Sequence, residues 1–448
     1  MRFIQAVGLF TLAICGVSAF AQPKVLTLEE AKQIALEKNE NVAQAQNNVT
    51  AAQSGVLAAY GSYLPTLSAS AGWTRQQSDQ SASTKLISGQ PFFLPASFSV
   101  LNNFSTGVSL GYNIFDGFAR GARFGQATSN AVATEQISAR TRQATVFQVE
   151  SGYFTVLRNE QLVKVAEENL KRDNRQLERI TESNRVGALS LADVYRQQSQ
   201  VAADELALIT AQNTYNKSIA DLLSLVGLDV SEDYTIADAS ISSELTKPEL
   251  DSAATFLSGF AALNQRALAA RPDYISAREN YDAATSGVTV ARSNYFPSIS
   301  AFAGYGVSND ELQRISANKS INWGLRLNWT LFDGFQTNQS LQTAVAQKRN
   351  AEISLVQTER NISVDVKKAL LDLDAARKQY EASQKGLISA TEDQKIAEER
   401  YNLGAGTLLD LLTANAGYVN AAVNKVTAVY NYFTAKANVL YVLGEKSY

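Results

Sequence analysis

Four segments of the chain alternate between apolar residues and small or polar ones, a pattern that predicts β-strands. In residues 104–114 the apolar or branched side chains occupy the even positions, and in 321–331 they occupy the odd positions. Residues 67–73 and 299–305 alternate in the same way. At about ten residues, such strands have the length that crosses a bilayer when tilted.

Alternation alone favours a soluble sheet with one solvated face. Two further features favour a membrane sheet. Trp73, Trp323 and Trp329 all lie in these segments, beside Tyr112 and Tyr305, as expected for an interfacial aromatic girdle. The opposite positions hold Gly, Ser and Asn, which suit a water-filled lumen. Four strands cannot close by themselves, and an open edge in lipid leaves backbone groups unpaired, so the sequence predicts an obligate oligomer.

Two very long helices follow the strands. Residues 119–186 and 336–403 contain no proline, and at 1.5 Å per residue each would be about 100 Å long. Apolar residues recur at coiled-coil spacing within them, at Val149, Val156, Val163, Leu170 and Leu177, and at Val366, Leu373, Tyr380 and Leu387. Gly187 and Gly404 are expected to end these helices, after which a second helix returns.

The chain contains two copies of one unit. "FDGF" occurs at 115–118 and again at 332–335, and "YLPTLSASAGW" at 63–73 matches "YFPSISAFAGY" at 295–305. The spacing between copies changes by 15 residues between Trp73 and Phe104, where Ser, Gly and Pro predict a long loop. We therefore expect a first repeat at 22–227, a linker at 228–262 and a second repeat at 263–448.

The repeated FDGF is predicted to mark the change from strand to helix. The aspartates would cap the first turn of the helix, the glycines would allow a sharp change of direction, and the phenylalanines would pack between neighbours. The residues assigned to this role are Phe115, Asp116, Gly117, Phe332, Asp333 and Gly334. Pro65 and Pro297 are predicted to mark the opposite change, from helix to strand.

Composition then excludes several classes of function. Residues 1–21 have the pattern of a cleavable signal peptide, and acylation of Cys15 is the alternative. Without them the chain has 39 basic residues (40 minus Arg2) and 43 acidic ones, and neither His nor Cys. Metal sites built on His or Cys and Ser-His-Asp catalysis are therefore excluded. No basic tract suggests nucleic-acid binding, and we expect neither a cofactor nor an enzymatic activity.

Taken together, the segment "TLEEAKQIALEKN", the paired strand motifs, the paired FDGF and the tips "NRVGALSLADV" and "YNLGAGTLLDLLTA" resemble the TolC family of outer-membrane efflux proteins. The resemblance implies a mixed α and β membrane protein. In that fold a homotrimer forms a 12-stranded outer-membrane β-barrel, with four strands per chain, continued into a long periplasmic α-helical coiled-coil barrel. The linker would form a belt around the tunnel.

The resemblance also implies a function and partners. The chain would be a passive exit duct in the outer membrane, extending into the periplasm, for small molecules or proteins in a tripartite efflux or type I secretion system. Its partners would be a periplasmic adaptor protein and an inner-membrane transporter. The alternative is a periplasmic coiled-coil scaffold without a pore.

Two sets of site residues are expected at the helical tips. Adaptor docking is assigned to Val186, Gly187, Ala188, Leu189, Leu403, Gly404, Ala405 and Gly406, although the glycines are equally explained as helix caps. From the resemblance, Asp410 would face the threefold axis, and Tyr401 and Asp193 would help to hold the tips closed. The alternative is that Asp193 and Asp410 only cap the return helices. Gly406 and Thr413 depart from the family's best-known member, which carries Arg and Asp there.

Overall fold

The structure is a computed structural model that describes residues 24–238, 241–242, 244–246, 250 and 259–445. The expected signal peptide and part of the expected linker lie outside these residues. The helices of the described part are α1 (Leu28–Lys38), α2 (Glu40–Gly61), α3 (Ala119–Arg185), α4 (Leu191–Val226), α6 (Phe260–Ala270), α7 (Pro272–Ser293), α8 (Gln336–Asn402) and α9 (Leu408–Leu443). The strands are β1 (Lys24–Leu26), β2 (Thr66–Gln80), β3 (Ser83–Ile87), β4 (Gln90–Leu94), β5 (Ser97–Phe115), β6 (Tyr234–Ile236), β7 (Ser298–Asn309) and β8 (Asn318–Asn328).

The chain folds into two compact units, each assembled from several stretches of sequence. The first unit consists of Met1–Asn39, Thr145–Phe256 and Asp372–Asn438, and the second of Glu40–Ala144, Leu257–Leu371 and Val439–Tyr448. Helices α3, α8 and α9 contribute to both units. Each unit thus contains parts of both sequence repeats, whose own boundaries remain a prediction.

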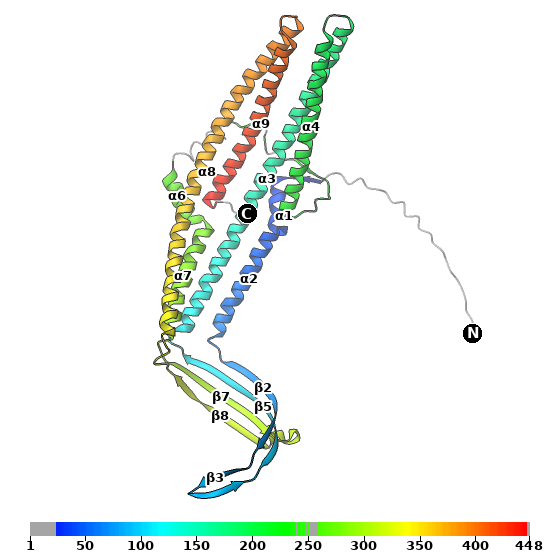
Figure 1. The fold of residues 1–448 in the computed structure, drawn as a ribbon. Coiled ribbons are helices and arrows are strands. Elements are labelled where there is room, and N and C mark those ends of the chain that lie inside the picture. Colours follow the sequence, from blue (N-terminus) through cyan, green and yellow to red (C-terminus); the bar gives the residue numbers. More distant parts are fainter. Residues whose placement is uncertain (1–23, 239–240, 243, 247–249, 251–258, 446–448) are drawn as a thin grey trace, which may run out of the picture. The chain divides into compact units, whose positions relative to one another are not determined.

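The first unit is built on two helical hairpins, α3–α4 and α8–α9 (Figure 1). Helices α3 and α8 have 67 residues each and end one residue before the predicted positions. The predicted heptad residues Val149, Val156, Val366, Leu373 and Tyr380 are at most 2% exposed, whereas Val163, Leu170, Leu177 and Leu387 are half-buried. The sevenfold spacing therefore marks a seam that is fully buried along only part of each helix.

The second unit contains an antiparallel sheet with the strand order β2-β5-β7-β8 (Figure 1). The register places Leu67 opposite Leu110 and Trp73 opposite Phe104, so the apolar positions of neighbouring strands share one face. These side chains are exposed, with Leu67 at 72%. On the other face the hydroxyls of Ser68 and Ser109 lie 2.8 Å apart. The expected division into an apolar and a polar face is therefore present.

Two details of the predicted strands are wrong. The segment between Trp73 and Phe104, expected to be a loop, consists mostly of strand, because β2 and β5 remain paired as far as Gln80 and Ser97 and the hairpin β3–β4 follows. Antiparallel pairing satisfies the backbone there despite the Ser, Gly and Pro content. The last strand ends at Asn328, so Trp329 lies just outside it, and its indole NH donates to the carbonyl oxygen of Tyr295 at 3.2 Å.

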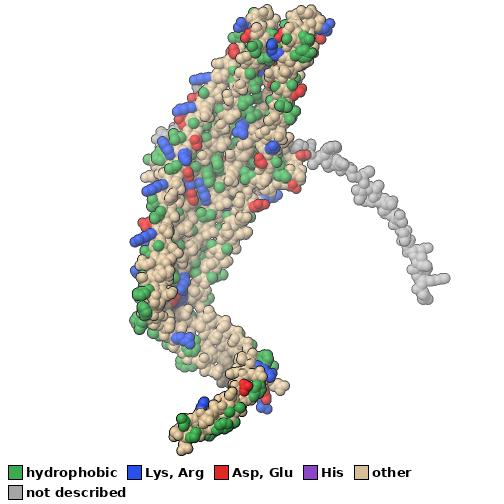
Figure 2. All heavy atoms as spheres, in the orientation of Figure 1, with side chains coloured by type: hydrophobic (Ala, Val, Ile, Leu, Met, Phe, Trp, Pro, Cys, Tyr) green, Lys and Arg blue, Asp and Glu red, His purple; other side chains and the backbone are tan. Residues whose placement is uncertain are grey.

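The hairpin β3–β4 leaves hydrophobic side chains in contact with solvent, visible as green spheres at the lower end of Figure 2. Charged side chains are spread along the helices in the same view. None of the helices in the described part of the chain is long and apolar enough to cross a membrane.

Candidate functional site

The two helical tips have the same backbone geometry. Gly187 has φ 78° and Gly404 has φ 73°, in the left-handed region. In the first tip the amide of Gly187 donates to the carbonyl of Asn184 at 2.9 Å, and that of Ala188 donates to the carbonyl of Ser183 at 2.8 Å. These are the two hydrogen bonds of a Schellman motif, which satisfies the last carbonyls of a helix. The second tip repeats both bonds, so each glycine ends its helix.

The return helices begin with matching side-chain caps. Thr407 Oγ1 accepts from the amide of Asp410 at 3.2 Å, and Asp410 Oδ2 accepts from the amide and hydroxyl of Thr407 at 3.0 and 2.8 Å. The hydrogen bond from the Thr407 backbone, followed by that from its side chain, lowers the pKa of Asp410. In the first tip Ser190 Oγ accepts from the amide of Asp193 at 3.2 Å, while the carboxylate of Asp193 accepts from the Ser190 hydroxyl at 2.8 Å and contacts Arg196 at 3.2 Å. Only Asp410 therefore caps a backbone amide with its side chain, and whether it has a second role at a gate stays a prediction.

A small apolar cluster joins the two hairpins next to the tips. Ile180 of α3, Val194 of α4 and Leu408 of α9 are its buried members. Leu189 and Tyr401 pack against it. Two residues from the predicted docking and gate sets therefore belong to the internal packing of the hairpins.

Tyr401 has its hydroxyl in this packed region rather than in water. Burial, and secondarily the charge of Asp193, raises the pKa of Tyr401. The hydroxyl makes no well-formed hydrogen bond among the described residues. Asp193 therefore lies close enough to Tyr401 for its charge to act on the hydroxyl, but no hydrogen bond joins the two side chains of the expected network.

An ion pair also links the hairpins close to the tips. Arg179 of α3 donates to Glu398 of α8 at 3.1 Å and to the side-chain oxygen of Asn402 at 3.5 Å. Both charged side chains are about half exposed, so solvent screens the pair and its contribution to stability is small. The sequence repeat does not predict this contact, because it joins positions that are far apart in the chain.

A buried polar layer, which the sequence analysis missed, lies farther along the hairpins. Asp173, Gln197 and Asp204 are each at most 6% exposed. The sequence contained a signal for this burial. Asp173 lies three residues after Leu170 and four before Leu177, which is a core position of the heptad pattern. Buried polar residues at such positions need partners. Gln197 Nε2 donates to the carbonyl oxygen of Asp173 and Asp204 Oδ1 accepts from Gln200, whereas Gln197 Oε1 and Asp204 Oδ2 have no partner among the described residues.

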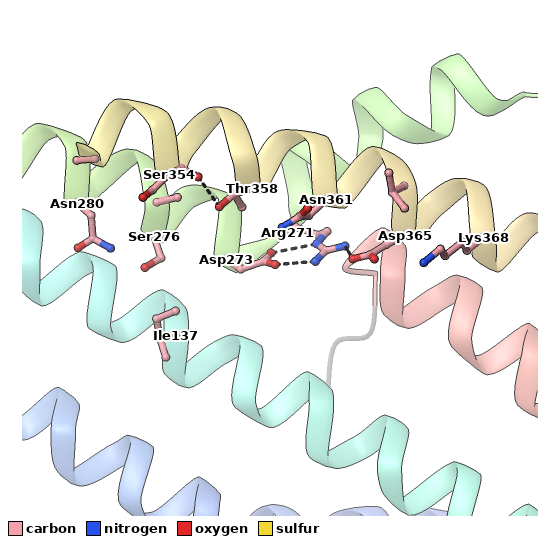
Figure 3. Close-up of a pocket in the computed structure, with 13 residues that line it drawn as sticks. Ile137, Arg271, Asp273, Ser276, Asn280, Ser354, Thr358, Asn361, Asp365 and Lys368 are labelled. Atoms are coloured by element: carbon pink, nitrogen blue, oxygen red, sulfur yellow. Dashed lines mark hydrogen bonds and ion pairs between the residues drawn. The ribbon is translucent and has the colours of Figure 1, made fainter. Parts of the chain in front are cut away.

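The second unit contains a groove of about 800 Å³ between α3, α7 and α8. Arg271 lies in it between two carboxylates, donating to Asp273 at 2.6 Å and to Asp365 at 3.1 Å (Figure 3). Arg271 is 4% exposed, so this is a buried, paired cation. Removing one partner of such a group leaves an uncompensated charge, and we therefore assign these residues to the stability of the unit.

Comparison with known proteins gives a consistent result. The model of the outer membrane efflux protein family matches residues 31–228 and 263–445. Protein CyaE of Bordetella pertussis is 26% identical over 422 residues, covering 94% of this chain and 84% of CyaE. The toluene efflux pump outer membrane protein TtgC of Pseudomonas putida is 27% identical over 326 residues, covering 71% of this chain and 64% of TtgC.

A solved structure confirms the fold independently of close sequence similarity. The CmeC outer membrane channel of Campylobacter jejuni superposes with a TM-score of 0.77 over 93% of this chain and 85% of CmeC, at 20% identity. At that identity the likeness concerns the fold alone. By their names, TtgC is an efflux pump outer membrane protein and CmeC is an outer membrane channel.

These findings confirm the predicted fold class, the location in the outer membrane and the role in efflux transport. The family model accounts for both sequence repeats, which contain the strands and the helical hairpins described above. The chain belongs to the outer membrane efflux protein family.

Proposed function

We propose that this protein is a passive exit duct that works as a homotrimer with a periplasmic adaptor protein and an inner-membrane transporter. It carries small molecules or proteins outward in a tripartite efflux or type I secretion system. The transporter supplies the energy, and the duct performs no catalysis.

One observation carries this proposal: the sheet has an exposed apolar face, a polar face and two edges without a partner strand. Strands β2 and β8 are the edges, and each pairs with a single neighbour within the described part of the chain. Unpaired backbone groups in lipid cost several kcal/mol each, roughly. Pairing β8 of one copy with β2 of the next satisfies these groups, and three copies give twelve strands, enough to leave a lumen.

We further propose that three Asp410 carboxylates form an acidic ring at the periplasmic end. Two features of Asp410 support this ring. The side chain is exposed, and the hydrogen bonds that it accepts from Thr407 lower its pKa, which favours the charged form. Carboxylates that converge on a narrow pore attract cations and repel anions. Asp193 and Tyr401 would assist closure through the packing and charge around the apolar cluster.

The adaptor is proposed to dock at the tip residues, where Val186 and Leu403 are 67% and 84% exposed. Leu189 faces the apolar cluster instead, so its contribution is to hold the shape of the turn.

Current measurements on the purified protein in planar bilayers test the duct and the acidic ring together. We expect stepwise conductance, a reversal potential that indicates cation preference in a salt gradient, and block by divalent cations added to the periplasmic side. Asp410→Asn keeps the size and part of the capping ability while removing the charge. It should reduce both cation preference and block, whereas Asp221→Asn, at an exposed position on α4, should leave both unchanged.

The possible outcomes separate the hypotheses. A folded protein without conductance would support the pore-free scaffold and contradict the duct. Conductance with the same selectivity and block in Asp410→Asn would leave the duct intact and reduce Asp410 to a helix cap.

A further inference from the structure

Two buried aspartates lie against each other inside the hairpin unit. Asp173 on α3 is 1% exposed and Asp204 on α4 is 6% exposed. Both residues line the same small cavity, close enough for Asp204 to raise the pKa of Asp173 through hydrogen bonding and charge. A hydrogen bond between the two carboxyl groups requires a proton on one of them, because two ionised carboxylates are acceptors only. Two adjacent charges in a buried site would also repel strongly.

Amide side chains from three helices complete the surroundings of the pair. Gln200 donates to Asp204 Oδ1 at 3.0 Å, and Asn415 of α9 donates to Asp173 Oδ1 at 3.5 Å. Gln394 of α8 in turn donates to Asn415 Oδ1 at 2.9 Å. The aspartates belong to one hairpin and Asn415 and Gln394 to the other, so this network joins the hairpins.

One oxygen of the pair has no hydrogen-bond donor. Asp204 Oδ2 is buried and accepts no hydrogen bond from the described residues, so a proton held between the two carboxyl groups would supply what it lacks. A cavity of about 160 Å³ adjoins the pair, lined also by Leu412, Ala416 and Val419 of α9. Loss of that proton would leave two buried negative charges against the single cation of Arg172, next to space into which water can enter.

The charged and titratable groups around the pair are few. On α3, Arg172 is the neighbouring cation, and its guanidinium lies 5.3 Å from the ring centre of Tyr418 on α9. On α4, Gln197 donates to the backbone carbonyl of Asp173 at 3.1 Å and carries no charge. The contact from α8 is the neutral amide of Gln394. One arginine thus faces two carboxyl groups.

Burial, followed by the hydrogen bond to Asp204 and its charge, raises the pKa of Asp173 to about 7, against the opposing effect of Arg172 and Gln197. An unfolded chain releases the same proton near pH 4, roughly. Between these values the folded state binds more protons than the unfolded state. The stability of the hairpin unit therefore falls as pH rises through this window.

We propose that Asp173 and Asp204 form a proton-binding site that fastens the α3–α4 hairpin to α9 when one proton is shared, and loosens this contact when the proton is lost. The proposal goes beyond the exit duct and concerns contacts within one chain, so it does not depend on the cargo or the partners. It makes the attachment of the hairpins sensitive to the pH of their surroundings.

Distance measurements by pulsed EPR test this proposal on the full-length protein in detergent. Nitroxides are placed on cysteines at Asn174 of α3 and Gly417 of α9, both exposed, in a Cys15→Ser background that contains no other cysteine. Labelled chains are diluted with unlabelled ones to isolate distances within one chain. Between about pH 5.5 and about pH 8.5, the population with a longer separation should rise relative to the shorter one, by up to about tenfold per pH unit.

Variants identify the group responsible. Asp204→Asn and Asp173→Asn each leave one charge and one amide, which imitates the protonated pair, so both should keep the short separation at every pH. Asp221→Asn, on the exposed surface of α4, should respond to pH like the unmodified protein. The proposal is wrong if the unmodified protein shows no pH response, or if Asp204→Asn and Asp173→Asn keep it. It is also wrong if CaCl₂ at constant pH restores the short separation, because the site would then hold a metal cation.

Discussion

At the scale of single residues, the two FDGF turns share a backbone conformation and differ in their surroundings. Gly117 and Gly334 have φ of 67° and 66°, and the phenylalanines that follow, Phe118 and Phe335, also have positive φ. A Cβ on Gly117 would lie 2.5 Å from the carbonyl oxygen of Ser293, whereas a Cβ on Gly334 would meet nothing within 4 Å. Glycine is required at the first turn for conformation and space, and at the second for conformation alone.

This difference predicts unequal effects of the same substitution. Gly334→Ala should lower the free energy of unfolding by about 1 kcal/mol, the typical cost of a left-handed conformation with a side chain. Gly117→Ala adds a clash with backbone and should cost roughly 2 kcal/mol more. Thermal unfolding in detergent, followed by circular dichroism, gives the order of the midpoints. Equal midpoints would show that the chain relaxes around residue 117.

The aspartates of the same turns also differ. Asp333 Oδ2 accepts from the amide and hydroxyl of Thr337 at 2.7 and 2.5 Å, which is the expected cap of the first turn of α8. Asp116 contacts Arg120 and Arg123 at 3.6 and 3.8 Å instead. Identical tetrapeptides therefore serve different local interactions, because the helices that follow them begin with different residues.

At the scale of the elements, the helical tips combine internal caps with exposed positions. The Schellman bonds hold each turn, and Leu189 packs inward, while Ala188 and Ala405 are exposed. A partner can therefore approach these alanines without disturbing the apolar cluster. The alternative to docking at these positions is that the tips serve only to reverse the chain.

Bulky substitutions separate these alternatives. Ala188→Trp and Ala405→Trp should reduce cross-linking to the adaptor and efflux in cells, because the indole fills the surface on which the partner is expected to pack. Neither should change the oligomeric state, since both side chains are exposed. Ala207→Trp, at an exposed position of α4, is the matched control. Normal cross-linking and efflux in both tip variants would place docking elsewhere.

At the scale of the whole molecule, the four-stranded sheet is incomplete by itself. Its edges β2 and β8 are unpaired in the described chain, and its apolar face is exposed, with Trp323 at 81%. Both features are unfavourable in an isolated chain, because apolar surface and backbone groups lack partners. Pairing of the edges between copies would satisfy the backbone groups, and a bilayer would cover the apolar face.

We therefore expect a detergent-stable particle with the mass of three chains. Light scattering corrected for bound detergent, together with native mass spectrometry, measures this mass directly. Infrared or circular dichroism spectra of the same sample should show that the strands are intact. A monomer with intact strands would contradict the closure of the sheet by copies, since its edges would then be stable without partners.

Sequence by itself determined the elements and their repetition. Proline-free heptads predicted α3 and α8 to within one residue at their ends. Alternation placed the apolar residues of all four strands on one face. Both predictions succeeded because these patterns are local consequences of backbone geometry. Local patterns failed where pairing decided the outcome, as between Trp73 and Phe104, where the partner strand extends the ladder through polar residues.

Only the tertiary structure decided which distant residues meet. The contact of Asp173 with Asn415 depends on two hairpins packing side by side, and neither periodicity nor the repeat specifies that packing. The proximity of Asp173 to Asp204 likewise depends on how α3 packs against α4. The same holds for Arg271 and Asp365 in the second unit. Burial changes the chemistry of such groups, since a carboxyl group that would be ionised in water holds a proton when it lies against another carboxyl group away from solvent.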